Sequence, residues 1–345
     1  MRTTVRTATA AARPTGSRRS SGCPGSKGGV MRKTAGILLL AFSAAVAAQN
    51  FPSKTVRFVS GVTPGSASDT MARILAEKLQ QKWGQPVIVE NKLGAGGLVG
   101  AKYVADSAPD GHMIMMYASA YTVAPLLSPN VLRFDELTPV AAVATIPTVL
   151  VTQPEKYKTI QEFVAKAKAS PGKLVCADAG IGSATHMAFE KFRFAAGIPD
   201  VLNVHTKGVG EAITEVVSGR ADCYFALVFQ ARKMVDSGKL VALATSSPKR
   251  SALMPNIPTT EELGYPNSHY NFWVGTLVPA KTPKAIVDKL HDDITALVES
   301  PEVNEKIRKL GCDPLPMSVK EFDDMIAGEI KENTALIKKA GIKAN

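Results

Sequence analysis

Short apolar segments alternate with amphipathic helical segments along most of the chain. Strands are expected at residues 55–60, 86–90, 112–117, 173–177, 201–204, 222–225 and 240–245. After the first of them, Met71, Leu75 and Leu79 recur at helical spacing and predict an amphipathic helix. Strands that alternate with helices favour an α/β fold with mainly parallel sheets flanked by helices. With 345 residues, the chain is long enough for two such domains.

The two expected domains lack a flexible tether between them. No segment after residue 50 has the composition of a linker, so two compact lobes must be joined by short crossings near residues 148–153 and 267–275. The C-terminal segment is helical and is expected to return to the first lobe. Lobe 1 is therefore predicted to comprise residues 51–150 and 272–345, and lobe 2 residues 151–271.

The formal net charge of +11 is concentrated at the N-terminus. Residues 1–48 hold 8 of the 41 lysine and arginine residues and no acidic residue, which leaves 33 basic and 30 acidic residues, a balance of +3, for the remainder. This small balance does not favour a nucleic-acid partner, because a polyanion is held through many phosphate contacts.

The basic N-terminal region contains a signal-peptide pattern. Met31-Arg32-Lys33 precedes an uncharged apolar run, residues 35–48, which ends in small residues and is shorter than a membrane span. We expect residues 31–48 to be a signal peptide cleaved after Ala47 or Ala48, and the protein to be periplasmic. Residues 1–30 are interpreted as an over-extended leader, with translation starting at Met31.

Motifs for catalysis, cofactors and metals are scarce. The segment 94–100 resembles a dinucleotide fingerprint, but Val99 stands where the third glycine belongs, so it is interpreted as a tight strand-to-helix turn. The five histidines show no metal-ligand spacing, and neither a cofactor nor a metal is expected. Cys176 and Cys223 are expected to be buried free thiols, with a disulfide between them as the alternative. Ser183 and His186 lack an orienting acid in sequence, which disfavours a hydrolase.

Two loops carry a different signal, because each joins a strand to a helix N-terminus and is rich in small residues. The first loop consists of Thr63, Pro64, Gly65, Ser66, Ala67, Ser68 and Asp69. The second runs over 178–185 and contains Gly180, Gly182, Ser183 and Thr185. Small residues let backbone N–H groups approach a ligand, and helix N-termini favour an anion. One such loop in each lobe predicts a site for a small carboxylate, whereas each loop alone is also explained by ordinary helix capping.

Many ordered segments between residues 51 and 342 are similar to one family. They include residues 51–54, 64–69, 84–92, 94–97, 108–111, 137–140, 170–173, 180–183, 237–240, 255–259 and 279–283. On these segments the chain resembles the Bug proteins, the extracytoplasmic solute receptors of tripartite tricarboxylate transporters. The resemblance implies a two-lobed type II periplasmic binding protein fold that closes on a small organic carboxylate. It further implies a monomer that delivers its ligand to two membrane subunits of the transporter.

The resemblance also assigns candidate ligand contacts. They are the seven residues of the first loop, together with Ser119, Gly180, Gly182, Ser183, Thr185, His186, Thr206, Lys207 and Ala226.

Four positions depart from the family pattern. Ser66 replaces a glycine, His205-Thr206 replaces Pro-Tyr, and Ala226 replaces an acid. The loss of that acid favours a carboxylate without a free amino group. Two alternatives stay open: a sensor that presents its ligand to a membrane kinase, and a secreted hydrolase.

Overall fold

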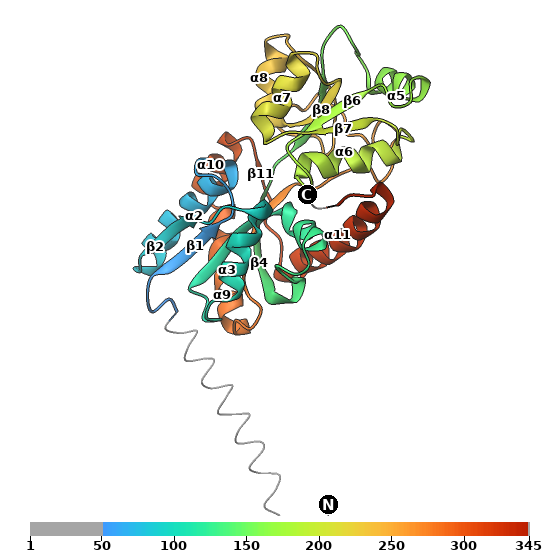
Figure 1. Cartoon of the computed structure of the whole chain (residues 1–345). Helices are drawn as coiled ribbons and strands as arrows, with labels where there is room; N and C mark the ends of the chain where they lie inside the picture. Colours follow the sequence, from blue (N-terminus) through green and yellow to red (C-terminus); the bar gives the residue numbers. More distant parts are fainter. Residues whose placement is uncertain (1–50, 344–345) are drawn as a thin grey trace, which may run out of the picture. The chain divides into compact units, whose positions relative to one another are not determined.

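The computed structural model describes residues 51–343, which form two sheets flanked by helices (Figure 1). The expected leader and signal peptide, residues 1–48, lie outside the described residues. None of the helices in the described part of the chain combines the length and the apolar character that a membrane crossing needs. We call the part built on the six-stranded sheet the first lobe, and the part built on the five-stranded sheet the second lobe.

The sheet of the first lobe has the strand order β11-β4-β10-β3-β1-β2. Its strands are β1 (Val56–Ser60), β2 (Val87–Asn91), β3 (Met113–Ala118), β4 (Leu137–Thr145), β10 (Trp273–Pro279) and β11 (Asp313–Pro314). Strand β1 pairs in parallel with β2 and β3, whereas β10 and β11 pair antiparallel with their neighbours.

The sheet of the second lobe has the order β7-β6-β8-β5-β9. Its strands are β5 (Thr148–Thr152), β6 (Val175–Asp178), β7 (Leu202–His205), β8 (Cys223–Leu227) and β9 (Val241–Thr245). Strand β6 is parallel to β7 and β8, and β5 is antiparallel to β8 and β9. The α/β class is confirmed, but the expectation of mainly parallel sheets is wrong, because both sheets are mixed. The parallel strands are those joined by helical crossovers, and the antiparallel pairs involve strands that enter or leave a lobe at a crossing.

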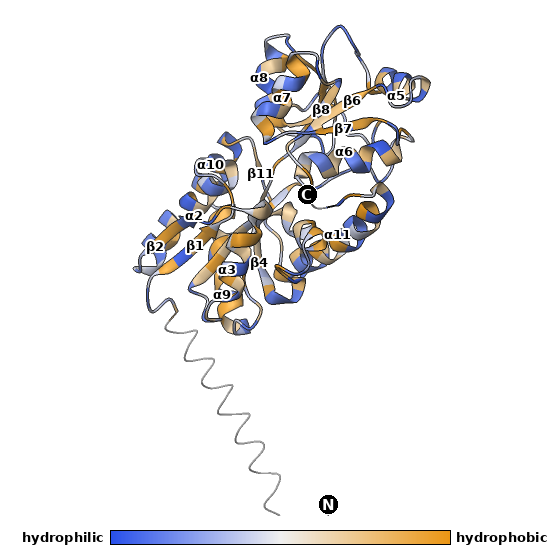
Figure 2. Cartoon of the chain, in the orientation of Figure 1, coloured by the Kyte–Doolittle hydropathy of each residue, from blue (hydrophilic) through white to orange (hydrophobic). Residues whose placement is uncertain are grey.

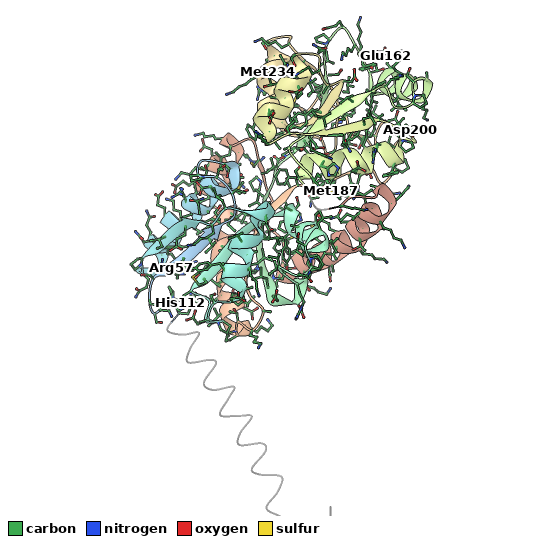
Figure 3. All side chains as sticks on the ribbon, in the orientation of Figure 1. Arg57, His112, Glu162, Met187, Asp200 and Met234 are labelled. Carbon is green, nitrogen blue, oxygen red and sulfur yellow. The ribbon has the colours of Figure 1, made fainter. Side chains whose placement is uncertain are left out.

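Helices cover both faces of each sheet (Figure 2). They are α2 (Ala67–Trp83), α3 (Leu98–Ala105), α4 (Ala124–Leu127), α5 (Ile160–Ala169), α6 (Ala184–Ala195), α7 (Val209–Val217), α8 (Val228–Asp236), α9 (Lys284–Glu299), α10 (Pro301–Lys309) and α11 (Val319–Ala340). In the first lobe α2, α9 and α10 share one apolar core, and α3 and α11 share the other. In the second lobe α5 and α6 cover one face, and α7 and α8 cover the other. Figure 3 labels Arg57 and His112 in the first lobe and Met187 and Met234 in the second.

Side-chain caps fix where several helices begin. Ser66 accepts a hydrogen bond from the Asp69 amide at the start of α2, and Ser183 accepts one from the His186 amide at the start of α6. Ser318 and Glu321 form a complete capping box at the start of α11. Each cap satisfies an amide that the helix leaves unpaired, so the loop before it is held in a defined position.

Two short crossings join the lobes. After β4, the Ile146 amide donates to the Phe272 carbonyl at 2.7 Å. After β9, the Tyr270 amide donates to the Ser246 carbonyl at 2.7 Å. The lobe boundaries expected at 150/151 and 271/272 stay a prediction.

The last helix contacts both lobes. The first half of α11 packs Phe322 and Ile326 into a core of the first lobe, and Leu336 and Ile337 near its end pack against a core of the second. Figure 1 shows α11 running from the first lobe toward α6. This bridging role was not expected from the sequence.

The two cysteines of the sheet in the second lobe face each other. Cys176 and Cys223 are register partners on β6 and β8, with their sulfurs 2.6 Å apart. Both are buried free thiols. Burial raises the pKa of both thiols above its usual value, which keeps them protonated at neutral pH.

Candidate functional site

A cavity of about 620 Å³ lies between the two lobes. Its lining residues are Gly61, Val62, Ser68, Gly94, Ala95, Gly96, Gly97, Leu98, Ala118, Ala120, Ala124, Leu127, Ser128, Ala179, Gly180, Ile181, Gly182, Ser183, Ala184 and Phe272. We call this cavity the cleft.

The topology of the sheets explains why these segments meet. Strands β1, β2 and β3 end at Ser60, Asn91 and Ala118, directly before lining segments of the first lobe. Strand β6 ends at Asp178, directly before the lining segment of the second lobe. The carboxyl ends of parallel strands are the usual place for a ligand in open α/β sheets. The cleft therefore occupies the expected edge of both sheets.

Most residues that line the cleft are small, and all of them are uncharged. Among the described residues that line the cleft, none carries an ionisable side chain, and Ser68, Ser128 and Ser183 supply the only hydroxyl groups. Helices α3 and α6 begin at the wall of the cleft, at Leu98 and Ala184. Their first amides have no partner within the helix and lie at the positive end of the helix dipole. Among the described lining residues, positive potential is therefore supplied by backbone groups.

Two glycines allow the walls of the first lobe to approach each other. A Cβ on Gly61 would lie 2.7 Å from the Cα atom of Gly97. Gly97 has a φ of +95°, and a Cβ there would lie 2.5 Å from the Tyr117 ring. The Tyr117 hydroxyl also donates to the Gly96 carbonyl at 2.9 Å. The 94–97 turn is therefore packed so closely that larger residues do not fit.

Asp69 holds the first loop in place. Its carboxylate is fully buried and accepts hydrogen bonds from the Gly65 amide (2.8 Å), the Asn91 side chain (2.7 Å) and the Arg73 guanidinium (3.0 and 3.1 Å). Asn91 also donates to the Val62 carbonyl at 3.0 Å. Burial by itself would raise the pKa of Asp69, but these hydrogen bonds outweigh burial and hold the pKa below its usual value. Asp69 is thus an ionised anchor beneath the loop.

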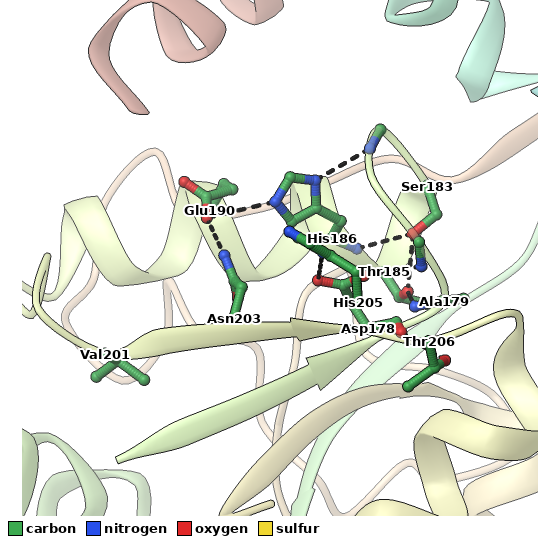
Figure 4. Close-up of polar contacts among 12 residues, drawn as sticks. Asp178, Ala179, Ser183, Thr185, His186, Glu190, Val201, Asn203, His205 and Thr206 are labelled. Carbon is green, nitrogen blue, oxygen red and sulfur yellow. Dashed lines mark hydrogen bonds and ion pairs between the residues drawn. The ribbon is translucent and has the colours of Figure 1, made fainter. Parts of the chain in front are cut away.

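Side chains behind the second loop fix its backbone. The Gly180 amide donates to Asp178 at 2.8 Å, and the Gly182 amide donates to Nδ1 of His186 at 3.1 Å. The Ala179 amide donates to the Thr185 hydroxyl at 3.0 Å (Figure 4). Asp178, Thr185 and His186 are buried. The loop conformation is therefore set from the side that faces away from the cleft.

Four of the predicted contacts line the cleft: Ser68, Gly180, Gly182 and Ser183. The other twelve do not line it. Of these, Thr63, Pro64, Gly65 and Lys207 are exposed, Ser66, Ala67 and Thr206 are half-buried, and Asp69, Ser119, Thr185, His186 and Ala226 are buried.

Several of these residues hold neighbouring backbone or side chains in place instead of lining the cleft. The Ser119 hydroxyl accepts from Tyr270 at 3.2 Å, and the Thr206 hydroxyl donates to the Asp178 carbonyl at 2.8 Å. Ala226 lies within β8, paired with Val149.

The sequence interpretation missed part of the lining. Gly94–Gly97 was interpreted only as a turn, and the turn indeed forms, but its other side faces the cleft. The signal for this role was its position directly after a parallel strand. Phe272 and the segment from Ala118 to Ser128 carried no comparable signal, because small and apolar residues occur equally in cores.

Ser183 and His186 are not arranged for nucleophilic catalysis. The Ser183 hydroxyl accepts from the His186 amide at 3.2 Å. The two ring nitrogens of His186 face the Gly182 amide and, at 3.6 Å, the Glu190 carboxylate. Neither ring nitrogen of His186 therefore contacts the Ser183 hydroxyl. A general base would have to lie within hydrogen-bond distance of the hydroxyl that it activates. Within the described residues, Asp178, His186 and His205 form the one group with the spacing for a metal ion.

Comparison with known proteins identifies a family and its fold. A family profile described as tripartite tricarboxylate transporter family receptor matches residues 71–342. The structure of the periplasmic binding protein BugD is 29% identical with a TM-score of 0.71, covering 86% of this chain and 100% of its own. MatC from Rhodopseudomonas palustris, with bound malate, is 28% identical with a TM-score of 0.70, covering 83% and 100%. Another R. palustris protein, with adipate, is 26% identical with a TM-score of 0.72, covering 85% and 99%.

Proposed function

The chain belongs to the tripartite tricarboxylate transporter receptor family, the Bug or TctC solute receptors, and from this premise we propose that it captures a small organic carboxylate in its cleft. The family is one of non-catalytic periplasmic binding proteins, so the chain binds its solute without converting it. The observation that carries the proposal is the uncharged, backbone-rich cleft between the lobes. Its volume of about 620 Å³ suits a small molecule.

The chemistry of the lining supports a carboxylate. Amides at the start of α3 and α6, and the hydroxyls of Ser68 and Ser183, can donate to carboxylate oxygens. Gly180 and Gly182 expose backbone at the same wall. We propose these four predicted residues, together with Gly94–Gly97, as the ligand contacts. Malate and adipate in the related structures are dicarboxylates and belong to the same chemical class.

The same lining disfavours amino acids. An ammonium group in the cleft would find no carboxylate among the described lining residues, and an unpaired buried charge is costly. We therefore propose a carboxylate without a free amino group.

Closure of the two lobes is the proposed mechanism. A solute that contacts both walls stabilises the closed arrangement, because it binds that arrangement better than the open one. The crossings at Ile146 and Tyr270 are the proposed hinges, near the proposed lobe boundaries at 150/151 and 271/272.

Membership of the family supports export and delivery to a membrane partner. We propose that residues 31–48 direct the protein to the periplasm, where the loaded monomer docks on two membrane subunits. N-terminal sequencing of the exported protein tests the cleavage after Ala47 or Ala48. Presentation of the solute to a membrane kinase is the alternative, and deletion of the transporter genes, which abolishes uptake only under the transport proposal, separates the two.

A calorimetric and thermal-shift screen tests the solute class. We expect malate, succinate or adipate to raise the melting temperature, since a ligand that binds only the folded state stabilises it. Ala120→Phe, which fills the cleft, should remove this shift, and Ala280→Phe on an exposed turn should retain it. Tight binding of aspartate or glutamate, with none of the other acids, would contradict the proposal.

A further inference from the structure

Three side chains that could ligate a metal meet behind the second loop. Asp178 ends β6, His186 lies in the first turns of α6, and His205 ends β7 (Figure 4). One potential ligand atom from each residue lies within 4.8 Å of the other two. Asp178 and His186 are buried, whereas the His205 side chain is 36% exposed. The group is thus built on rigid elements and reachable from solvent.

This group is separate from the cleft. None of the three residues lines the cleft, whereas His186 and His205 line a second cavity of about 260 Å³. The end of the described chain, from Ala340 to Lys343, lines the same second cavity. An ion could therefore enter without passing through the solute site.

The residue types suit a first-row divalent ion. Two imidazoles and one carboxylate are a ligand set that zinc accepts while keeping an open coordination position. Nδ1 of His205 lies 2.8 and 3.1 Å from the two Asp178 oxygens. Ligand atoms around tetrahedral zinc stand about 3.3 Å apart, so this pair is already close to the required spacing. Because the His205 ring is partly exposed, it can rotate so that an ion held by His205 and Asp178 also comes within reach of His186.

A second layer of contacts orients these ligands. The Gly180 amide donates to Asp178 at 2.8 Å. Glu190 is fully buried and lies 3.6 Å from Nε2 of His186, and its other contacts are to Arg193 and Asn203. A carboxylate behind a ligating imidazole is the usual outer-shell arrangement of metal sites. Arg193, which lines the same cavity, donates to Glu190 and to two backbone carbonyls, so its charge is paired with the Glu190 carboxylate.

We propose that Asp178, His186 and His205 bind a divalent transition-metal ion, with zinc as the probe, and leave a coordination position open to the 260 Å³ cavity. Ion binding replaces the hydrogen bond between Nδ1 of His205 and the Asp178 carboxylate. No oxidation or reduction is involved.

Binding through His186 has a consequence for the wall of the cleft. Nδ1 of His186 accepts from the Gly182 amide. An ion on Nδ1 would replace that amide, and an ion on Nε2 would require a proton on Nδ1, so either mode ends the hydrogen bond. Gly182 lines the cleft. The environment of its amide should therefore change when the ion binds.

Titration calorimetry with zinc, and visible absorption with cobalt, test the site in protein purified without a polyhistidine tag. We expect one ion per chain, and a loss of affinity of more than about tenfold in His205→Ala and His205→Tyr. His269→Ala is the matched control, because His269 also contacts a carboxylate, Glu261 at 2.8 Å, but belongs to no three-residue group. A wild-type protein that binds no zinc, or a His205→Ala variant that binds as tightly, overturns the proposal.

An NMR readout tests the role of His186 without altering it. In protein labelled with ¹⁵N-glycine, zinc should shift the Gly182 amide resonance. The Gly238 amide, in an open turn after α8, is the control and should not move. Zinc binding with an unmoved Gly182 resonance would exclude His186 as a ligand and overturn the three-residue site.

Discussion

The indole N–H of Trp273 donates a 2.8 Å hydrogen bond to the Glu329 carboxylate and so joins strand β10 to helix α11. The Thr122 hydroxyl donates to the same carboxylate oxygen at 3.4 Å, and Asn333 donates to Thr122 at 2.9 Å. Further along α11, Glu332 pairs with Lys191 of the second lobe at 2.7 Å. A buried carboxyl group thus sits in the helix that contacts both lobes, next to the crossing at Phe272.

Ionisation of Glu329 should make stability fall with rising pH. Burial raises its pKa from 4.5 to about 7, although the Trp273 and Thr122 hydrogen bonds act to lower it. The folded state therefore holds a proton that the unfolded state has lost between about pH 4.5 and 7. Over that window the free energy of unfolding should drop by roughly 3 kcal/mol as the pH rises.

The substitution Glu329→Gln removes this titration and should flatten the dependence between pH 5 and 8. At pH 8 we expect the variant to be more stable than the wild type, measured by urea unfolding. Glu305→Gln, at an exposed salt bridge with Lys309, is the control and should follow the wild-type curve. A Glu329→Gln curve that falls as steeply as the wild type would contradict the assignment.

Trp273 should report solute binding. It directly follows Phe272, which lines the cleft, and the chain has one other tryptophan, Trp83, which donates to Asp293 at 2.7 Å in the first lobe. In Trp83→Phe, malate or another solute identified by calorimetry should change the emission, because Phe272 moves with closure. In Trp273→Phe the same solute should leave the Trp83 emission unchanged.

Gly97 and Gly96 offer a matched pair of substitutions. Both have positive φ, but a Cβ on Gly97 would meet the Tyr117 ring at 2.5 Å, whereas one on Gly96 has its nearest neighbour at 3.9 Å. Gly96→Ala should cost about 1 kcal/mol for backbone strain alone. Gly97→Ala should cost clearly more and abolish solute binding, since the turn must move. Equal melting temperatures for the two variants would show that the close approach does not matter.

Asp69→Asn should weaken the first loop. The variant loses charge-assisted bonds to Arg73 and the Gly65 amide, which predicts a loss of about 2–3 kcal/mol at pH 7 and weaker solute binding. Asp135→Asn removes a comparable but exposed contact with Arg133 and should leave the stability nearly unchanged.

The pH dependence of the Asp69 effect has a defined sign. The pKa of Asp69 lies below its usual 3.8 in the folded protein, so its contribution is present above about pH 4 and is lost on further acidification. Unfolding measurements should therefore show the wild type and Asp69→Asn converging at low pH. A gap that widens on acidification would contradict the role of the ionised carboxylate.

The sequence by itself determined the local structure. The periodicity of Met71 and Leu75 predicted a helix, which the structure contains as α2. The caps at Ser66, Ser183 and Ser318 likewise depend on residues only a few positions apart. The glycine-rich loop after β6 was likewise visible, because a strand followed by small residues and an N-cap is a local pattern.

Only the tertiary structure decided which residues share a surface. Asp69 supports its loop instead of facing the cleft, while the 94–97 turn does face it. His205 reaches Asp178 from a neighbouring strand, and α11 extends from the first lobe to the second. These relationships depend on strand order and on packing between distant segments. A sequence pattern determines on which face of its own helix or strand a residue lies. It does not determine which distant residues that face will contact.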